Sequence, residues 1–119
     1  MARKIDQFGN YVRRLRGQRN VSLRRFAAQV GISATYLSKV ERGDLPPPGE
    51  ETIRAIAIAL DKNADAFLAV AGRIPSELTE VVKDTQAEMV PFLRRLGSFS
   101  KAKKKAFLIR FMKDLDRAR

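Results

Sequence analysis

Helical periodicity runs through almost the whole chain and is broken only at short stops. Apolar residues recur at intervals of three and four, which places them on one face of an α-helix. No stretch shows the sustained alternation of a strand. Gly31 and Gly43 suit helix ends, and Ser22 and Ser33 suit the position that caps a helix start. The sequence therefore predicts an all-α protein.

The first part of the chain holds five of these helical segments. The second and third helices are expected over residues 22–30 and 33–42. The run Pro46-Pro47-Pro48-Gly49 forces an extended loop before the fourth helix. Asn63 is suited to cap a fifth helix, which closes at Gly72. Five short helices in this length predict a compact helical domain.

A helical C-terminal region is expected over residues 74–119, after the five-helix domain at 1–73. Helical spacing continues from Leu78 to Leu96, where Pro91 predicts either two helices or one kinked helix. The last helix is expected over about residues 101–117.

The charge of the chain is strongly positive and unevenly spread. Lys and Arg number 24 against 13 Asp and Glu, which gives a formal net charge of +11. Residues 1–43 alone carry ten basic and two acidic side chains. Such a surface favours polyanions as partners, with nucleic acid first among them.

The chain contains no Cys and no His, which narrows the chemistry open to it. Disulfides, thiolate nucleophiles and cysteine-bound zinc are excluded, and the commonest general base is missing. We expect no metal, no cofactor and no enzymatic activity. The longest apolar runs, such as residues 55–60, are too short to span a bilayer, and residues 1–6 lack a hydrophobic signal region. The expected location is the cytoplasm, with no membrane partner.

The second and third helices are separated only by Gly31 and Ile32, which is helix-turn-helix geometry. The small side chain of Ala27 lets the two helices approach closely, and Gly31 can take the positive φ of the turn. The expected outward face of the third helix carries small or polar side chains: Ala34, Thr35, Ser38, Lys39 and Arg42. Residues of these types read base edges or contact phosphates.

These residues amount to a family resemblance. Residues 22–33 (SLRRFAAQVGIS) and 36–43 (YLSKVERG) resemble the Cro/CI-type, Xre-like helix-turn-helix regulators. The resemblance covers about residues 6–73 and implies a lambda-repressor-like five-helix fold. It also implies sequence-specific binding of double-stranded DNA, usually as a homodimer on an inverted repeat, in a bacterial or phage-encoded regulator. One departure is that Leu23 and Ala34 stand where many members have Gln or another polar residue.

The resemblance assigns roles to single residues. It implies base reading by Ala34, Thr35, Ser38 and Lys39. It implies contacts to the DNA backbone by Ser22, Ser33, Tyr36 and Arg42. It also implies a structural pair between Arg16 and Glu41.

Several of these residues have plainer interpretations. Lys39 can contact phosphate or water instead of a base, and a helical serine such as Ser38 often bonds the carbonyl four residues earlier. Tyr36 is compatible with a half-buried core position. Arg24 and Arg25 fit a solvated helix face.

The last helix carries more apolar residues than the surface of a monomer accommodates, so they are expected to form core with the preceding helical segment or a dimer interface. The residues expected to form a dimer interface are Phe107, Leu108, Phe111, Met112 and Leu115. A regulator, most often a repressor in this family, is the leading interpretation. The alternative is an antitoxin-like protein that binds a partner protein through its C-terminal helices and autoregulates through the helix-turn-helix.

Overall fold

The computed structural model describes residues 4–118, with side chains from residue 7 onward. Every regular element in this range is helical, which confirms the all-α prediction. The chain divides into two units, Met1–Glu77 and Leu78–Arg119. The division places residues 74–77 with the first unit, beyond the domain boundary expected at residue 73.

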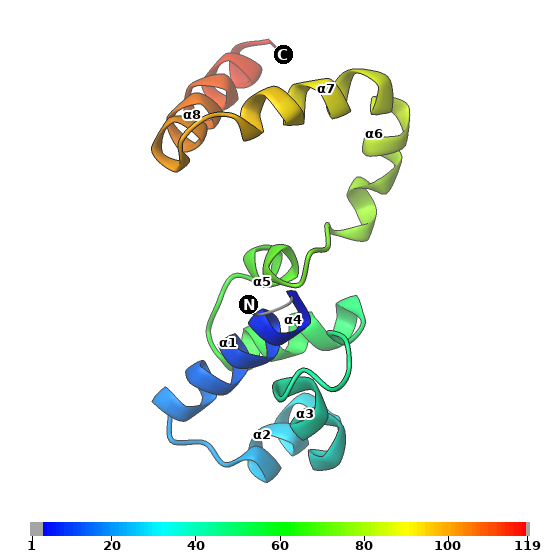
Figure 1. Cartoon of the computed structure of the whole chain (residues 1–119), viewed down its shortest axis with the longest axis vertical. Coiled ribbons are helices and arrows are strands. Elements are labelled where there is room, and N and C mark those ends of the chain that lie inside the picture. Colours follow the sequence, from blue (N-terminus) through cyan, green and yellow to red (C-terminus); the bar gives the residue numbers. More distant parts are fainter. Residues whose placement is uncertain (1–3, 119) are drawn as a thin grey trace. The chain divides into compact units, whose positions relative to one another are not determined.

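Five α-helices make up the first unit (Figure 1). They are α1 (Lys4–Gln18), α2 (Leu23–Val30), α3 (Ala34–Glu41), α4 (Glu50–Ala59) and α5 (Ala64–Val70). The predicted side-chain caps are confirmed: the side-chain oxygens of Ser22, Ser33 and Asn63 each accept a backbone N–H three residues later. Each cap satisfies one of the N–H groups that a helix start leaves without an intrahelical partner.

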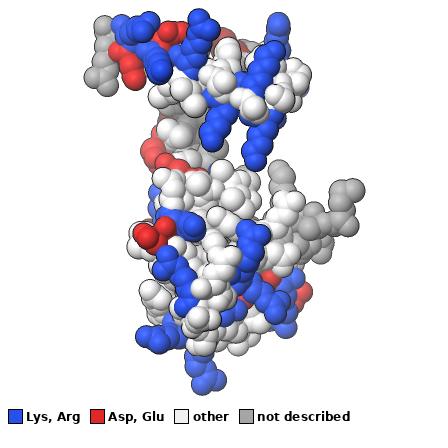
Figure 2. All heavy atoms as spheres, turned by 90° about the vertical axis from the view of Figure 1, so that its left-hand side faces the viewer, with Lys and Arg blue, Asp and Glu red and all other residues white. Residues whose placement is uncertain are grey.

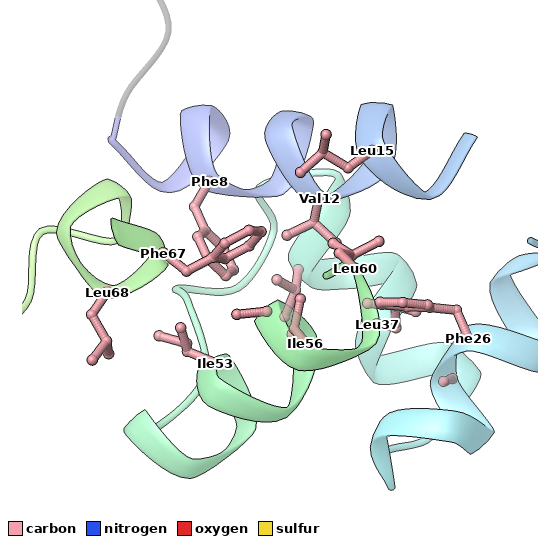
Figure 3. Packing of buried hydrophobic residues seen from close by; sticks show 13 residues of the cluster. Phe8, Val12, Leu15, Phe26, Leu37, Ile53, Ile56, Leu60, Phe67 and Leu68 are labelled. Atoms are coloured by element: carbon pink, nitrogen blue, oxygen red, sulfur yellow. The ribbon is translucent and has the colours of Figure 1, made fainter. Parts of the chain in front are cut away.

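The apolar faces of all five helices meet in one core. Phe8, Val12, Phe26, Leu37 and Ile56 are among its almost fully buried members. Figure 3 shows Phe8 of α1 and Phe67 of α5 pointing toward each other, and their rings meet edge to face with centroids 6.0 Å apart. The helices of the first unit therefore pack around one shared hydrophobic core.

The backbones of α1 and α3 come into direct contact at Gly9. A Cβ added there would lie 2.3 Å from the carbonyl oxygen of Val40 and 2.7 Å from that of Glu41. Only glycine leaves room for this approach, because real Cβ atoms do not come so close to a carbonyl oxygen.

The end of the first unit is tied back to the loop before α4. The Arg73 guanidinium donates hydrogen bonds to the carbonyl oxygens of Pro47 and Pro48. The backbone N–H of Ser76 donates to Glu50 Oε1 at 2.9 Å, and its hydroxyl donates to Oε2 at 3.1 Å. These contacts hold residues 73–76 against the five-helix domain.

The second unit contains the end of a short 3₁₀ helix, η1 (Ser76–Leu78), followed by α6 (Thr79–Asp84), α7 (Gln86–Gly97) and α8 (Lys101–Arg117). The break in the predicted segment falls at Thr85, while Pro91 lies inside α7. At Thr85 the backbone departs from helical angles, with φ −116° and ψ 18°, and the Thr85 hydroxyl donates to the carbonyl oxygen of Val81 at 2.6 Å. No described helix is long and apolar enough to cross a membrane.

Four phenylalanines join α7 and α8 in the second unit. Phe107 lies at the centre of this cluster: its ring contacts those of Phe92, Phe99 and Phe111 at centroid distances of 5.9–6.2 Å. Nevertheless, no residue described in the range 78–118 is buried. Over this described range the second unit has an aromatic cluster but no buried core.

Candidate nucleic-acid interface

The α2–α3 junction has the geometry of a helix-turn-helix. Gly31 ends α2 with φ 79°, the left-handed conformation that the sequence predicts there. The backbone N–H of Ile32 donates to the carbonyl oxygen of Ala27 at 3.0 Å, which closes the turn. Ala27 itself is buried where the two helices pack. The turn fixes the direction of α3 relative to α2.

The structure divides the predicted base-reading residues into two groups. Thr35 and Lys39 are exposed on the outer face of α3. Ala34 is half-buried and packs against the core, and Ser38 is half-buried and lines a cleft toward α1. The side chains that can reach a partner most directly from α3 are therefore Thr35 and Lys39.

The predicted backbone-contacting residues flank this face. Ser22 and Ser33 are exposed at the starts of α2 and α3, where their hydroxyls are engaged as caps. The first turns of both helices nevertheless present N–H groups and a positive dipole end. Tyr36 is half-buried and packs against the core, in agreement with the alternative interpretation of this residue as a core position.

Arg42 follows α3 and is exposed. Its Nε lies 3.3 Å from Asp44 Oδ2 in an ion pair whose two side chains are both more than half exposed. Figure 2 shows Lys and Arg side chains projecting from the end of the first unit that holds α2 and α3. Exposed pairs of this kind are weak, so Arg42 remains available to an anion.

A bidentate ion pair between Arg16 and Glu41 locks α1 to the end of α3. Arg16 Nε donates to Glu41 Oε2 and Nη2 donates to Oε1, both at 2.9 Å. The third guanidinium nitrogen, Nη1, donates to the carbonyl oxygen of Val21 at 2.9 Å. The hydrogen bond and charge of Glu41 raise the pKa of Arg16 above its ordinary value. The side chains are 15% and 4% exposed, so the pair is largely withdrawn from water.

A cleft of about 190 Å³ opens between α1, the start of α2 and the end of α3. It is lined by Arg13, Arg16, Leu23, Ser38, Glu41 and Arg42. No functional role was predicted for Arg13 from the sequence. The sequence feature that points to Arg13 is its spacing of three residues from Arg16, which places both side chains on the same face of α1. The cleft combines residues from three helices, beside the exposed face of α3.

The described residues contain no group of three or more His, Cys, Asp and Glu side chains placed to hold a metal ion. The site presents cations, hydroxyl groups and helix N-termini, which are the groups that usually contact the phosphate backbone of a nucleic acid.

Comparison with known proteins agrees with this geometry. Residues 7–65 match the family of the helix-turn-helix domain. An uncharacterized HTH-type transcriptional regulator of Mycobacterium tuberculosis is 39% identical over 74 residues, covering 61% of this chain and 52% of the relative. The HTH-type transcriptional repressor RghR of Bacillus subtilis is 31% identical over 70 residues, covering 59% of this chain and 52% of the repressor. The chain thus spans about half the length of these curated relatives.

A solved structure shares the fold. The clp gene regulator ClgR from C. glutamicum superposes with a TM-score of 0.51 at 26% identity, covering 60% of this chain and 92% of the other. The turn geometry, the family match and the relatives agree, and they confirm the resemblance seen in the sequence. Residues 7–65 of this chain are a helix-turn-helix domain of the family found in HTH-type transcriptional regulators.

Proposed function

We propose that the protein binds double-stranded DNA sequence-specifically and represses transcription by occupying an inverted-repeat operator as a dimer. The observation that carries this proposal is the exposed face of α3, where Thr35 and Lys39 project beside Arg42. An α-helix fits the major groove, where each base pair presents a distinct pattern of donors and acceptors. The ion pair between Arg16 and Glu41 holds α3 against α1, which supports a fixed orientation of these side chains.

The two exposed residues of α3 have different roles in this proposal. Lys39 donates to the O6 and N7 acceptors of guanine, while the Thr35 hydroxyl donates or accepts and its methyl contacts thymine. Ala34 contributes an apolar contact at the start of the helix. The starts of α2 and α3, at Ser22 and Ser33, direct N–H groups toward phosphates and fix the register.

The dimer in this proposal forms through α8. The side chains of Phe107, Leu108, Phe111, Met112 and Leu115 are 40–55% exposed. A second copy that covers this stripe also brings two recognition helices together, and two-fold symmetry matches them to the halves of an inverted repeat. Repression, rather than activation, is supported by the likeness to RghR, which is named a repressor.

The same stripe favours one second candidate, an antitoxin-like protein whose α8 binds a different protein. The exposed leucine and methionine side chains of α8 can pack against a helix of another protein as well as against a second copy. In this candidate the helix-turn-helix domain still binds DNA and regulates the protein's own gene.

The experiment that tests the proposed function is selection of bound sites from random duplex DNA at a stated salt concentration. The expected result is a two-fold symmetric consensus. If about six phosphates are contacted, log affinity falls with log salt at a slope near −5. Equal affinity for selected and random DNA would contradict sequence-specific recognition.

A further inference from the structure

We propose that the cleft between α1 and α3 binds one phosphodiester group of the DNA backbone, with Arg13 as its principal cation. The inference rests on the proposed function and adds α1 to the surface that meets DNA. Ser38, expected from the sequence to read a base, contributes its hydroxyl to the phosphate instead.

The charges that line the cleft favour an anion. Among the described residues that line it, Glu41 is the only acid, and both of its carboxylate oxygens accept hydrogen bonds from the guanidinium of Arg16. That pair is internally neutral, which leaves the charges of Arg13 and Arg42 unmatched within the cleft. Arg42 forms an ion pair with Asp44, and because both side chains are largely exposed, a phosphate can replace the carboxylate.

The chemistry of the lining suits phosphate in particular. Guanidinium groups bind phosphate oxygens through directed, charge-assisted hydrogen bonds. Ser38 adds a hydroxyl, which donates to the same kind of oxygen. The volume of about 190 Å³ has room for several water molecules at about 30 Å³ each, or for a phosphate that keeps part of its hydration.

The position of the cleft agrees with a duplex docked on α3. Ser38 and Lys39 are neighbours on that helix, so a duplex whose base edges meet Lys39 carries a sugar-phosphate strand past Ser38. Leu23, the first residue of α2, forms another wall of the cleft. A phosphate bound here touches α1, α2 and α3 together and sets the register of the protein on the duplex.

The neighbouring residue Arg14 provides a matched control. It lies on the same helix and carries the same charge, and its guanidinium sits over the Tyr11 ring at 5.3 Å. It lines a different hollow, together with Gln7, Asn10 and Val70. Arg13→Ala and Arg14→Ala therefore remove equal charge from two different sides of α1.

The test measures the affinity of the full chain and both variants for the selected site and for random DNA, across a salt series. Arg13→Ala should weaken binding to both DNAs by the same factor, about tenfold, and make the salt slope shallower by about 0.9. Arg14→Ala should change affinity less than about twofold. Equal losses in the two variants overturn the inference and leave the proposed function standing, whereas a parent that binds no DNA overturns both.

A second measurement leaves the protein intact. Each phosphate of the selected site is replaced in turn by an uncharged methylphosphonate. One position per half-site should cost the parent about tenfold in affinity and cost Arg13→Ala almost nothing further, because both changes remove the same contact. Independent, additive losses at every phosphate would overturn the assignment of Arg13 to the cleft.

Discussion

The guanidinium of Arg16 and the carboxylate of Glu41 face each other edge to edge, joined by two hydrogen bonds of 2.9 Å. Glu41→Ala leaves this cation largely buried without its partner, and we expect it to lower the free energy of unfolding by about 2–4 kcal/mol. Asp44→Ala, which removes only the exposed pair with Arg42, should cost less than about 1 kcal/mol. Urea unfolding measures both. Equal midpoints for parent and Glu41→Ala would contradict a structural role for the pair.

Gly9 and Gly17 lie in the same helix but have opposite surroundings. Gly9→Ala places a methyl group against the carbonyl oxygens of Val40 and Glu41, and should destabilise the domain by about 2 kcal/mol or more. Nothing lies within 4 Å of a Cβ added at Gly17, so Gly17→Ala should raise stability by about 0.5–1 kcal/mol through helix propensity. Thermal unfolding of the two variants checks the contrast, and a shift of the same sign in both would refute it.

Replacing either exposed residue of α3 should change sequence preference. Thr35→Ala and Lys39→Ala are each expected to cost about 1–3 kcal/mol on the selected site and to relax preference at one or two bases per half-site. Arg24→Ala, on the exposed face of α2, should weaken binding to all DNA sequences by the same factor and leave the consensus unchanged. Repeating the site selection with each variant tests this, and an unchanged consensus would move recognition away from α3.

The contact between Glu50 and Ser76 should depend on pH. The backbone N–H of Ser76, hydrogen-bonded to the carboxylate, holds the pKa of Glu50 below its ordinary value of 4.5. A lowered pKa in the folded state means that the contact stabilises above 4.5 and is lost as pH falls through the lower, folded value. NMR should show the Ser76 amide shifting with a midpoint below 4.5. The same titration in Glu50→Gln should show no such step.

Ending the chain at Glu77 should leave the first unit folded but mainly monomeric. All buried hydrophobic residues of the described chain precede this point, and the Arg73 and Ser76 contacts are retained. Loss of linked half-site contacts should weaken operator binding by about a hundredfold. Sedimentation compares the oligomeric states of the two chains. A truncated protein that dimerises and binds as well as the full chain would favour the antitoxin-like candidate.

Local signals were sufficient for the starts of α2, α3 and α5 and for the end of α2, whereas α5 ends at Val70, before the predicted Gly72. The hydroxyls of Ser22 and Ser33 cap helices because the residues that they bond lie three positions away, and Gly31 takes its positive φ within a single turn. These relationships are visible in any short window of the sequence. The pattern of apolar residues likewise predicted which side of each helix enters the core.

Features that depend on distant parts of the chain could not be read in this way. The close approach at Gly9 depends on backbone carbonyl oxygens at the end of α3, and the spacing of apolar residues does not predict how near those oxygens lie. The cleft at Arg13 exists only because three helices pack around it. In the second unit Pro91 marked the expected break or kink, but the backbone at Thr85 departs from helical angles, so α6 ends earlier and Pro91 lies inside α7.

The absence of a buried side chain among residues 78–118 gives the two halves of the chain different thermodynamics. The first unit has its own core, so its melting temperature should not vary with protein concentration. If a second copy covers α8, as proposed, the helices of the second unit gain stability from that contact, and by mass action this gain rises with protein concentration. On this proposal the first unit folds independently of protein concentration, while the folded fraction of the second unit depends on how much of the covering copy is present in solution.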